Sequence, residues 1–404
     1  MQRHILSLLM SMVVLSPMAI DIYLASIPQM AFEFNASTGQ VQLTIVLFFF
    51  AMGLGQIFVG PIADRYGRRP VAIFGLSFYV LGSLAAGLAS DIFYLQISRL
   101  IQGFAACAIS VTIFSTVRDT YSYERSSKIY SYLNGVLGVV PACAPILGSL
   151  LASDFGWRSN FLFMFAYGLL VLGLVCRFMP ETLKAENRYS SAVAKLYDWP
   201  RFLPILKSHY FIFYALCCMV ALAAILSYVS YAPLWLIGHL QISKVAFSLL
   251  FGLNACAGIF CSFTAPILIN RYGNRTLVFI ALSCMLGAAL LLMVFNSLFN
   301  FQGFNAGLAF MLPIILLSAG LSFALGPATS MALSQFGDRA GSASALLGFT
   351  QMVGASVITF LVQQTDLIAP LAVATVLVIF VLPLWLIMLL PKYSHWNDER
   401  SAEP

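Results

Sequence analysis

Charged residues are scarce in this chain. Asp, Glu, Lys and Arg make up 9% of its 404 residues, whereas hydrophobic residues make up 61%. Soluble domains carry about 25% charged residues, so this composition excludes a soluble domain and indicates a polytopic membrane protein. The 4 histidines lie at span ends or in the tails, so no histidine relay crosses the membrane.

The cysteines do not indicate a disulfide framework or a metal site. All 8 lie inside long apolar runs, where cysteine acts as a small apolar residue. They are Cys107, Cys143, Cys176, Cys217, Cys218, Cys256, Cys261 and Cys284.

Apolar runs long enough to cross a bilayer as helices follow one another along the whole chain. They predict an all-α fold of 12 transmembrane helices, at 5–27, 39–60, 71–90, 92–117, 128–152, 159–178, 209–232, 244–269, 277–297, 306–330, 343–363 and 369–390. We expect an N-terminal six-helix bundle at 1–178, a linker at 179–208, a C-terminal six-helix bundle at 209–390 and a tail at 391–404.

The basic residues predict the orientation. With the N-terminus inside, nearly all of them fall in cytoplasmic segments; only Arg158 and Lys244 fall outside, and Arg99 falls within a span. Cytoplasmic loops of membrane proteins carry an excess of Lys and Arg, so both termini, the linker and the tail are expected in the cytoplasm. The net charge of +6 therefore describes a membrane face and does not indicate a nucleic-acid partner.

A dense charge cluster separates the second and third spans. Residues 60–71 read G-P-I-A-D-R-Y-G-R-R-P-V, and a degenerate copy, N-R-Y-G-N-R, stands at 270–275 between spans 8 and 9. The copy lies about half a chain away, which indicates an internal repeat of six spans per half. Gly67 permits the turn and Pro61 can begin it.

The stretch at 60–71 resembles the loop between helices 2 and 3 of the major facilitator superfamily. Further stretches resemble the Bcr/CflA exporters of the drug:H⁺ antiporter-1 family, most closely their MdtL branch. They are D-I-Y-L-A-S-I-P at 21–28, R-L-I-Q-G at 99–103, V-R-D-T-Y at 117–121, P-E-T at 180–182, R-A-G-S-A-S-A-L at 339–346 and the helix 5 motif with Gly135, Gly138, Pro141, Pro145 and Gly148. Ala144 and Ser149 replace glycines of that motif.

Two charges stand well inside predicted spans, Asp21 and Arg99. A charged side chain at the centre of a bilayer costs at least about 2.5–3.5 kcal/mol, so one that persists there is a functional candidate. Both lie at similar depth in the same half and can share a cavity. A movement that changes their separation would load and unload a proton; the alternative is a fixed structural ion pair.

A second group of candidates lies at the cytoplasmic surface, where the resemblance implies a latch between helix ends. The alternative is a merely topological role for its cations. The latch candidates are Gly60, Asp64, Arg65, Gly67, Arg68, Arg118 and Asp119. The prolines and glycines of span 5 are expected to bend it and to let a neighbour approach closely, with generic packing as the alternative.

The candidates for a substrate cavity are polar and aromatic residues of both halves. Any one of the aromatics can instead belong to an interface belt or a core. The candidates are Tyr23, Gln102, Asn134, Tyr228, Tyr231, Trp235, Asn254 and Gln351. A mostly apolar cavity with few polar anchors suits amphipathic drugs.

The resemblance implies proton-coupled export of amphipathic drugs, such as chloramphenicol- or bicyclomycin-type compounds, across the bacterial inner membrane by alternating access. The expected partners are the drug, protons and membrane lipid, with a monomeric chain, no cofactor and the proton gradient as energy source. A proton-coupled transporter of a small metabolite, exporter or uptake symporter, remains the alternative. No G-x-x-x-x-G-K loop for ATP occurs, and no span supplies an enzyme's nucleophile with its partner or a metal cluster.

Overall fold

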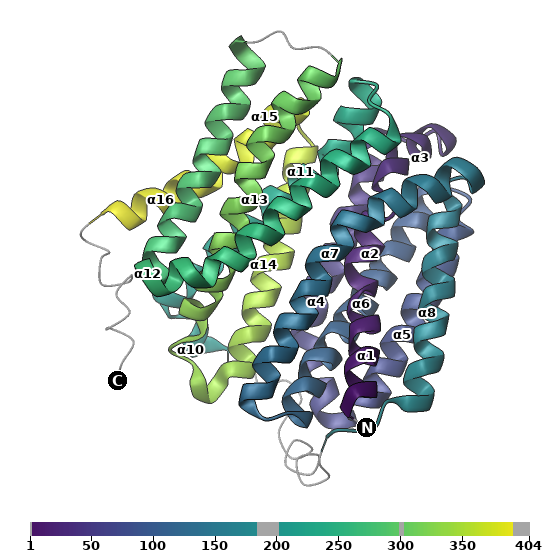
Figure 1. Cartoon of the computed structure of the whole chain (residues 1–404), viewed down its shortest axis with the longest axis vertical. Helices are drawn as coiled ribbons and strands as arrows, with labels where there is room; N and C mark the ends of the chain where they lie inside the picture. The colour runs from purple at the N-terminus through teal and green to yellow at the C-terminus, as the bar shows by residue number, and fades with distance from the viewer. Residues whose placement is uncertain (1, 184–201, 299–302, 391–404) are drawn as a thin grey trace. The chain divides into compact units, whose positions relative to one another are not determined.

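The computed structural model describes residues 2–183, 202–298 and 303–390, which divide into two compact units, Met1–Asp198 and Trp199–Pro404. All regular structure within these residues is helical (Figure 1). The predicted tail at 391–404 and most of the predicted linker lie outside the described residues.

The first unit begins with a broken span and continues with five long helices. The broken span comprises α1 (Gln2–Val13), α2 (Leu15–Asp21), the 3₁₀ turn η1 (Leu24–Ser26) and α3 (Ile27–Glu33). The long helices are α4 (Thr38–Tyr66), α5 (Arg68–Gly87), α6 (Ile92–Thr120), α7 (Tyr123–Phe155) and α8 (Arg158–Phe178). Helix α6 packs against both α4 and α5, and α7 packs against α2.

The second unit is built from longer and more irregular helices. They are α10 (Leu203–Leu206), α11 (His209–Pro233), the π-helical turn η3 (Leu234–His239), α12 (Lys244–Leu298), α13 (Gly303–Leu333), the 3₁₀ turn η4 (Gly337–Arg339), α14 (Ala340–Gln363), α15 (Ala369–Val376), the π-helical turn η5 (Leu377–Val381) and α16 (Leu382–Leu389). Helix α13 packs against α11 and α12, and α11 also packs against α14.

The helices start and stop where the local chemistry requires it. Ser37 and Gln40 form a reciprocal capping box at the start of α4, and the Asp91 side chain accepts hydrogen bonds from the backbone N–H groups of Phe93 and Tyr94 at the start of α6. Helix α8 ends at Phe178, two residues before Pro180, whose ring cannot continue a helix.

The described residues contain 11 apolar segments long enough to span a membrane. One of them, Lys244–Ser297, has 54 residues and contains a non-helical residue at Gly273, so it accounts for two of the expected spans, 244–269 and 277–297. The prediction of an all-helical polytopic membrane protein is therefore confirmed.

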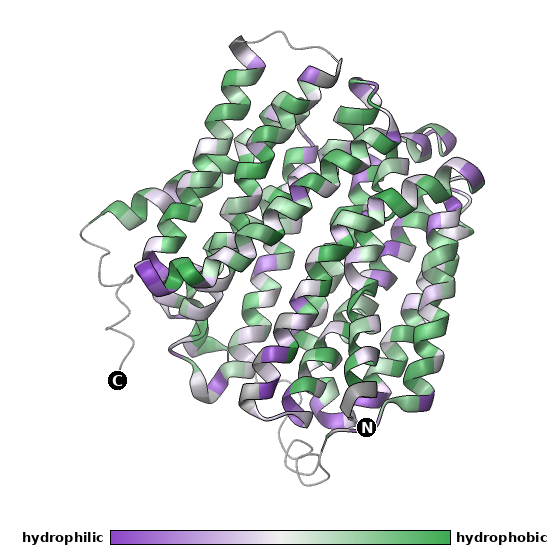
Figure 2. Cartoon of the chain, viewed as in Figure 1, coloured by the Kyte–Doolittle hydropathy of each residue, from purple (hydrophilic) through white to green (hydrophobic). Residues whose placement is uncertain are grey.

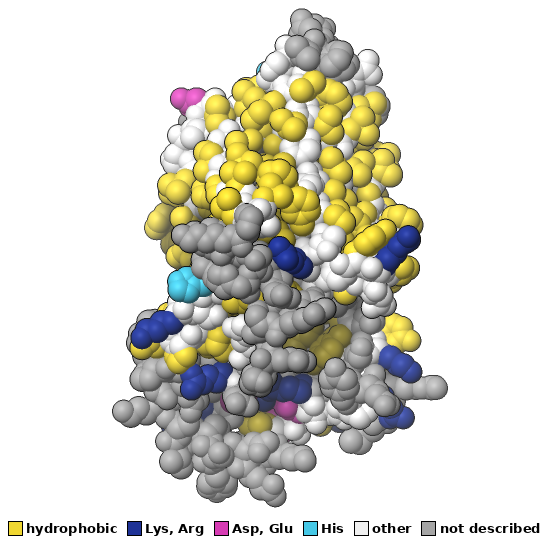
Figure 3. All heavy atoms as spheres, turned by 90° about the vertical axis from the view of Figure 1, so that its left-hand side faces the viewer, with side chains coloured by type: hydrophobic (Ala, Val, Ile, Leu, Met, Phe, Trp, Pro, Cys, Tyr) yellow, Lys and Arg dark blue, Asp and Glu magenta, His cyan; other side chains and the backbone are white. Residues whose placement is uncertain are grey.

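Exposed apolar side chains match this membrane setting. Helices are hydrophobic along most of their lengths, with hydrophilic residues gathered toward their ends (Figure 2). In the second unit, Phe260, Phe263 and Ile267 are 70%, 71% and 67% exposed on α12. Figure 3 shows hydrophobic side chains over much of the face that it displays. A bilayer offers such apolar side chains an apolar environment.

The two copies of the repeated R-Y-G phrase adopt similar backbone conformations at their glycines, one in each unit. Gly67 has φ 107° and ψ 161° between α4 and α5, and Gly273 has φ 80° and ψ 163° within α12. Both conformations lie in the region that favours glycine. The expectation that Pro61 begins the first turn is wrong, because α4 continues through Pro61 to Tyr66 and the chain turns only at Gly67.

Candidate functional site

The first span breaks at the candidate proton carrier. Helix α2 ends at Asp21, and the 3₁₀ turn at Leu24–Ser26 leads into α3. The span predicted at 5–27 lies within one candidate span, Ile5–Glu33, which contains this 3₁₀ turn. A break within a span leaves backbone groups outside the regular helical ladder, which is tolerated only where protein or water covers them. Asp21 is 5% exposed at this break.

Helix α7 covers the break by approaching it unusually closely. A Cβ atom added to Gly148 would overlap the carbonyl oxygen of Ile22, so only glycine fits there without a backbone shift. Gly148 thus has a specific packing partner in the residue next to Asp21. This contact supports the predicted role of the helix 5 motif in close packing.

The structure shows no comparably close contact for the other members of the helix 5 motif. Pro141 and Pro145 both lie inside α7. Gly138 is half-buried, and a Cβ atom on Gly135 would meet nothing within 4 Å. Close approach is therefore a property of Gly148, whereas the bend that we predict from the prolines remains a prediction.

Arg99 is fully buried in the first unit, at 0% exposure. Its Nη1 donates to the Gln102 side-chain oxygen, and the Gln102 amide nitrogen donates to the Ser83 hydroxyl at 2.8 Å. The guanidinium carbon lies 4.9 Å from the Tyr23 ring centroid and 4.6 Å from that of Phe48. Side chains from α4, α5, α6 and the broken first span therefore enclose this cation, partly through cation–π contacts.

Only part of the hydrogen-bonding capacity of the Arg99 guanidinium is used in this enclosure. Its Nε and Nη2 atoms are buried and have no hydrogen-bond partner in the structure. Within the described residues, no carboxylate lies within 4.0 Å of Arg99, so the alternative of a fixed Asp21–Arg99 ion pair is not what this conformation shows. Two buried ionisable side chains, one acidic and one basic, thus lie in one unit without forming an ion pair, and the free energy of such groups is sensitive to any change in their surroundings.

The charge cluster beside the Gly67 turn is centred on Arg68, which is 2% exposed. Its Nη1 lies 2.7 Å from Asp64 Oδ1, and its Nε lies 2.8 Å from Asp119 Oδ2. One guanidinium thereby joins the end of α4, the start of α5 and the end of α6. The structure brings together the three latch candidates Asp64, Arg68 and Asp119, and Gly67 supplies the turn that places Arg68 there.

The remaining latch candidates are peripheral. Arg118 is 63% exposed, and its Nε lies 3.7 Å from Asp119 Oδ1. The exposed Arg65 forms no ion pair within the described residues and lies over the neighbouring Tyr66 ring, 5.7 Å from its centroid. A Cβ atom on Gly60 would meet nothing within 4 Å, so close packing does not require glycine there.

Sequence reasoning missed Glu181 as a member of this cluster. Its Oε1 accepts from the backbone N–H groups of Arg68 at 3.0 Å and Leu183 at 2.9 Å, and its Oε2 accepts from that of Arg69 at 3.3 Å. Arg69 Nη2 also donates to the Cys176 carbonyl at 2.7 Å. The P-E-T phrase at 180–182 was the available signal, but its sequence gives no indication of a partner 113 residues away.

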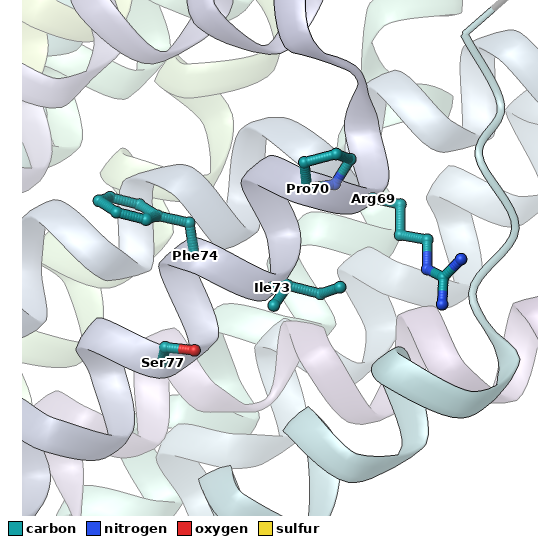
Figure 4. Close-up of a pocket in the computed structure, with 5 residues that line it drawn as sticks. All are labelled: Arg69, Pro70, Ile73, Phe74 and Ser77. Atoms are coloured by element: carbon teal, nitrogen blue, oxygen red, sulfur yellow. The ribbon is translucent and has the colours of Figure 1, made fainter.

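A shallow pocket lies beside this cluster on the exposed side of α5. Figure 4 shows its lining residues along one helix, with Arg69 and Pro70 at one end and Ile73, Phe74 and Ser77 following. Its volume is about 540 Å³, and Phe74 is 56% exposed. None of these residues belongs to the Asp21 and Arg99 group, so we assign the pocket no part in transport.

The cavity candidates of the first unit fall into two kinds. Tyr23 and Gln102 are fully buried around Arg99, and the Tyr23 hydroxyl shares a hydrogen bond with the Thr44 hydroxyl at 3.0 Å. Asn134 is exposed on α7. The first two residues therefore help to enclose Arg99.

Most candidates of the second unit form ring contacts or hydrogen bonds with other residues of that unit. Tyr228 stacks on Phe251 with ring centroids 5.6 Å apart, and the Tyr231 hydroxyl donates to the Val362 carbonyl at 3.0 Å. Asn254 accepts a hydrogen bond from the Ser318 hydroxyl at 2.9 Å. Trp235 stacks on His239, and Gln351 is half-buried on α14. Their part in substrate binding stays a prediction.

The fold and the sequence both define a membrane transport protein. The model of the Major Facilitator Superfamily matches residues 9–359, and the chain belongs to that superfamily. It is similar to multidrug resistance protein MdtL of Vibrio parahaemolyticus, with 30% identity over 95% of each chain. It is also similar to MdtL of Escherichia coli, with 31% identity over 92% of this chain and 94% of that one.

Solved transporters share the fold at low sequence identity. A D-xylose–proton symporter matches with a TM-score of 0.75 at 14% identity, over 95% of this chain and 97% of that one. A POT family transporter matches with a TM-score of 0.78 at 12% identity, over 98% and 96%. The match to the superfamily model and the similarity to MdtL proteins confirm the relation inferred from the motifs.

Proposed function

We propose that this protein exports amphipathic drugs across the bacterial inner membrane in exchange for protons, by alternating access. Membership of the superfamily supports transport, and the similarity to MdtL proteins supports drugs as the substrate class. Proton coupling is supported by Asp21, a carboxyl group that is 5% exposed within a candidate membrane span.

The observation that carries this proposal is that two buried ionisable side chains, Asp21 and Arg99, lie in one unit without forming an ion pair. Arg99 keeps two guanidinium nitrogens without partners, and Asp21 stands at a break in the span that also supplies Tyr23 to the Arg99 enclosure. A shift of the broken segment can change how strongly Arg99 stabilises the ionised form of Asp21. Proton uptake and release then follow the conformation.

The membrane potential adds to the driving force. A potential near 100 mV is worth about 2.3 kcal/mol for each elementary charge that crosses the membrane. A proton that enters at Asp21 from outside and leaves inside can therefore support the outward movement of a drug. The cluster of Asp64, Arg68 and Asp119 serves in this proposal as a latch that breaks and re-forms during the cycle.

The proposal is tested by drug accumulation in cells that lack their own exporters. Cells that express the chain should contain less labelled chloramphenicol than cells with an empty vector, and a protonophore should abolish the difference. Greater accumulation in expressing cells would identify uptake instead of export. An unchanged level for a panel of amphipathic antibiotics would favour a small metabolite as the substrate.

A further inference from the structure

The start of α5 has no cap of its own. Gly67, the residue before the helix, has no side chain to accept hydrogen bonds from the first backbone N–H groups, and these groups otherwise lack partners inside the helix. The capping acceptor comes instead from Glu181, which follows α8 in the segment that leads toward the second unit.

The Glu181 carboxylate uses both of its oxygens at this point. It bridges the N–H groups of Arg68 and Arg69, at 3.0 Å and 3.3 Å, and holds its own segment through the N–H of Leu183 at 2.9 Å. A carboxylate is favoured at a helix N-terminus because the helix dipole is positive there. The bond from Arg69 to the Cys176 carbonyl at 2.7 Å ties the same turn to the end of α8.

The residue that Glu181 holds by its backbone is also the centre of the latch. Arg68 reaches Asp64 and Asp119 with its side chain, at 2.7 Å and 2.8 Å, while its N–H contacts Glu181. The bonds from a guanidinium to two carboxylates are geometrically specific, so a shift of the backbone that carries it weakens them. The backbone contact therefore sets the position from which the side chain works.

We propose that Glu181 is a positioning residue for the latch, coupling the segment after α8 to the Arg68 pairing with Asp64 and Asp119. This inference rests on the proposed function for its effect on transport, but the pairing itself is independent of the substrate. When Glu181 releases the start of α5, Arg68 loses its alignment with Asp119 and the latch weakens.

The test is a double-mutant cycle between Glu181→Ala and Asp119→Asn, with Asp154→Asn as a control. Asp154 is an exposed acid at the far end of α7. Melting temperature, drug affinity and maximal export rate are measured for each purified or reconstituted variant. We expect Glu181→Ala to reduce the maximal export rate about tenfold with drug affinity within about twofold, since the lost bonds are charge-assisted.

The effects of Glu181→Ala and Asp119→Asn should be non-additive. Once Asp119 is neutral its ion pair with Arg68 is already lost, so the loss of Glu181, which acts through Arg68, has little further effect. Glu181→Gln should fall between wild type and Glu181→Ala, because its remaining oxygen still accepts from Arg68. Additive melting shifts, or an unchanged export rate per folded molecule, would show an ordinary helix cap and overturn the proposal. If the wild type exports no drug, the proposed function fails, and the melting cycle still decides the role of Glu181.

Discussion

Replacement of Gly148 by Ala should disturb the break beside Asp21 more than any other single methyl group in α7. The added Cβ atom would overlap the Ile22 carbonyl oxygen, far inside the 3.4 Å at which ordinary contacts begin. The two segments must therefore move apart. The obstacle is backbone, so rotation of a side chain cannot relieve it.

The energetic balance follows from two opposing effects. Overpacking of this kind costs about 1–3 kcal/mol, and the upper end applies because backbone is struck. Alanine in a helix gains roughly 0.5–1 kcal/mol over glycine, which leaves a net loss of about 2 kcal/mol. For a unit of this size that loss lowers the melting temperature by roughly 4–8 °C.

Gly135→Ala is the matched control on the same helix. Its Cβ atom would meet nothing within 4 Å, so this variant should melt at or slightly above the wild-type temperature. Thermal melting of the purified proteins in detergent, together with drug efflux from vesicles, distinguishes the two. If Gly148→Ala melted like Gly135→Ala and transported normally, the close approach of α7 to Ile22 would not matter and the reasoning would be wrong.

Three further predictions concern the other contacts. Asp64→Asn should slow export while drug binding stays near wild type, because it weakens one of the two carboxylate contacts of Arg68; normal export would exclude Asp64 from the latch. Tyr23→Phe should cost about 1 kcal/mol of stability by removing the buried bond to Thr44 but retain transport, since the ring still covers Arg99; loss of transport at normal stability would instead indicate contact with substrate or proton. Glu33→Gln should lower the melting temperature, because Glu33 Oε2 accepts from Trp157 Nε1 at 2.7 Å and Arg158 Nη1 at 3.0 Å. An unchanged melting temperature would show that the negative charge of Glu33 adds no stability through these two contacts.

Features encoded by consecutive residues could be predicted from the sequence. The length and hydrophobicity of each run predict the helices, and the repeated R-Y-G phrase predicts the turns at Gly67 and Gly273. The contact between Asp64 and Arg68 is also short in sequence, with the Gly67 turn between the two residues. In each case the physical cause is local, so one window of sequence contains it.

Features that depend on how helices rotate about their axes could not be predicted. Similar depth placed Asp21 and Arg99 near each other in the expected fold, but depth alone does not say which way each side chain points. The partner of Glu181 lies 113 residues away. The close approach of Gly148 to the turn after Asp21 is a tertiary contact, so Pro28 in the first turn of α3 signals a new helix start but not the partner that packs against it.

The most direct measurement of proton coupling is the release of protons when drug is added to the purified protein in weakly buffered detergent solution. If drug and proton exchange through Asp21, wild type should release protons on drug binding, and Asp21→Asn should release few. The variant should also insert normally but lose efflux driven by a pH gradient in vesicles. Proton release from Asp21→Asn equal to that of wild type would remove Asp21 from the mechanism and contradict the proposed coupling.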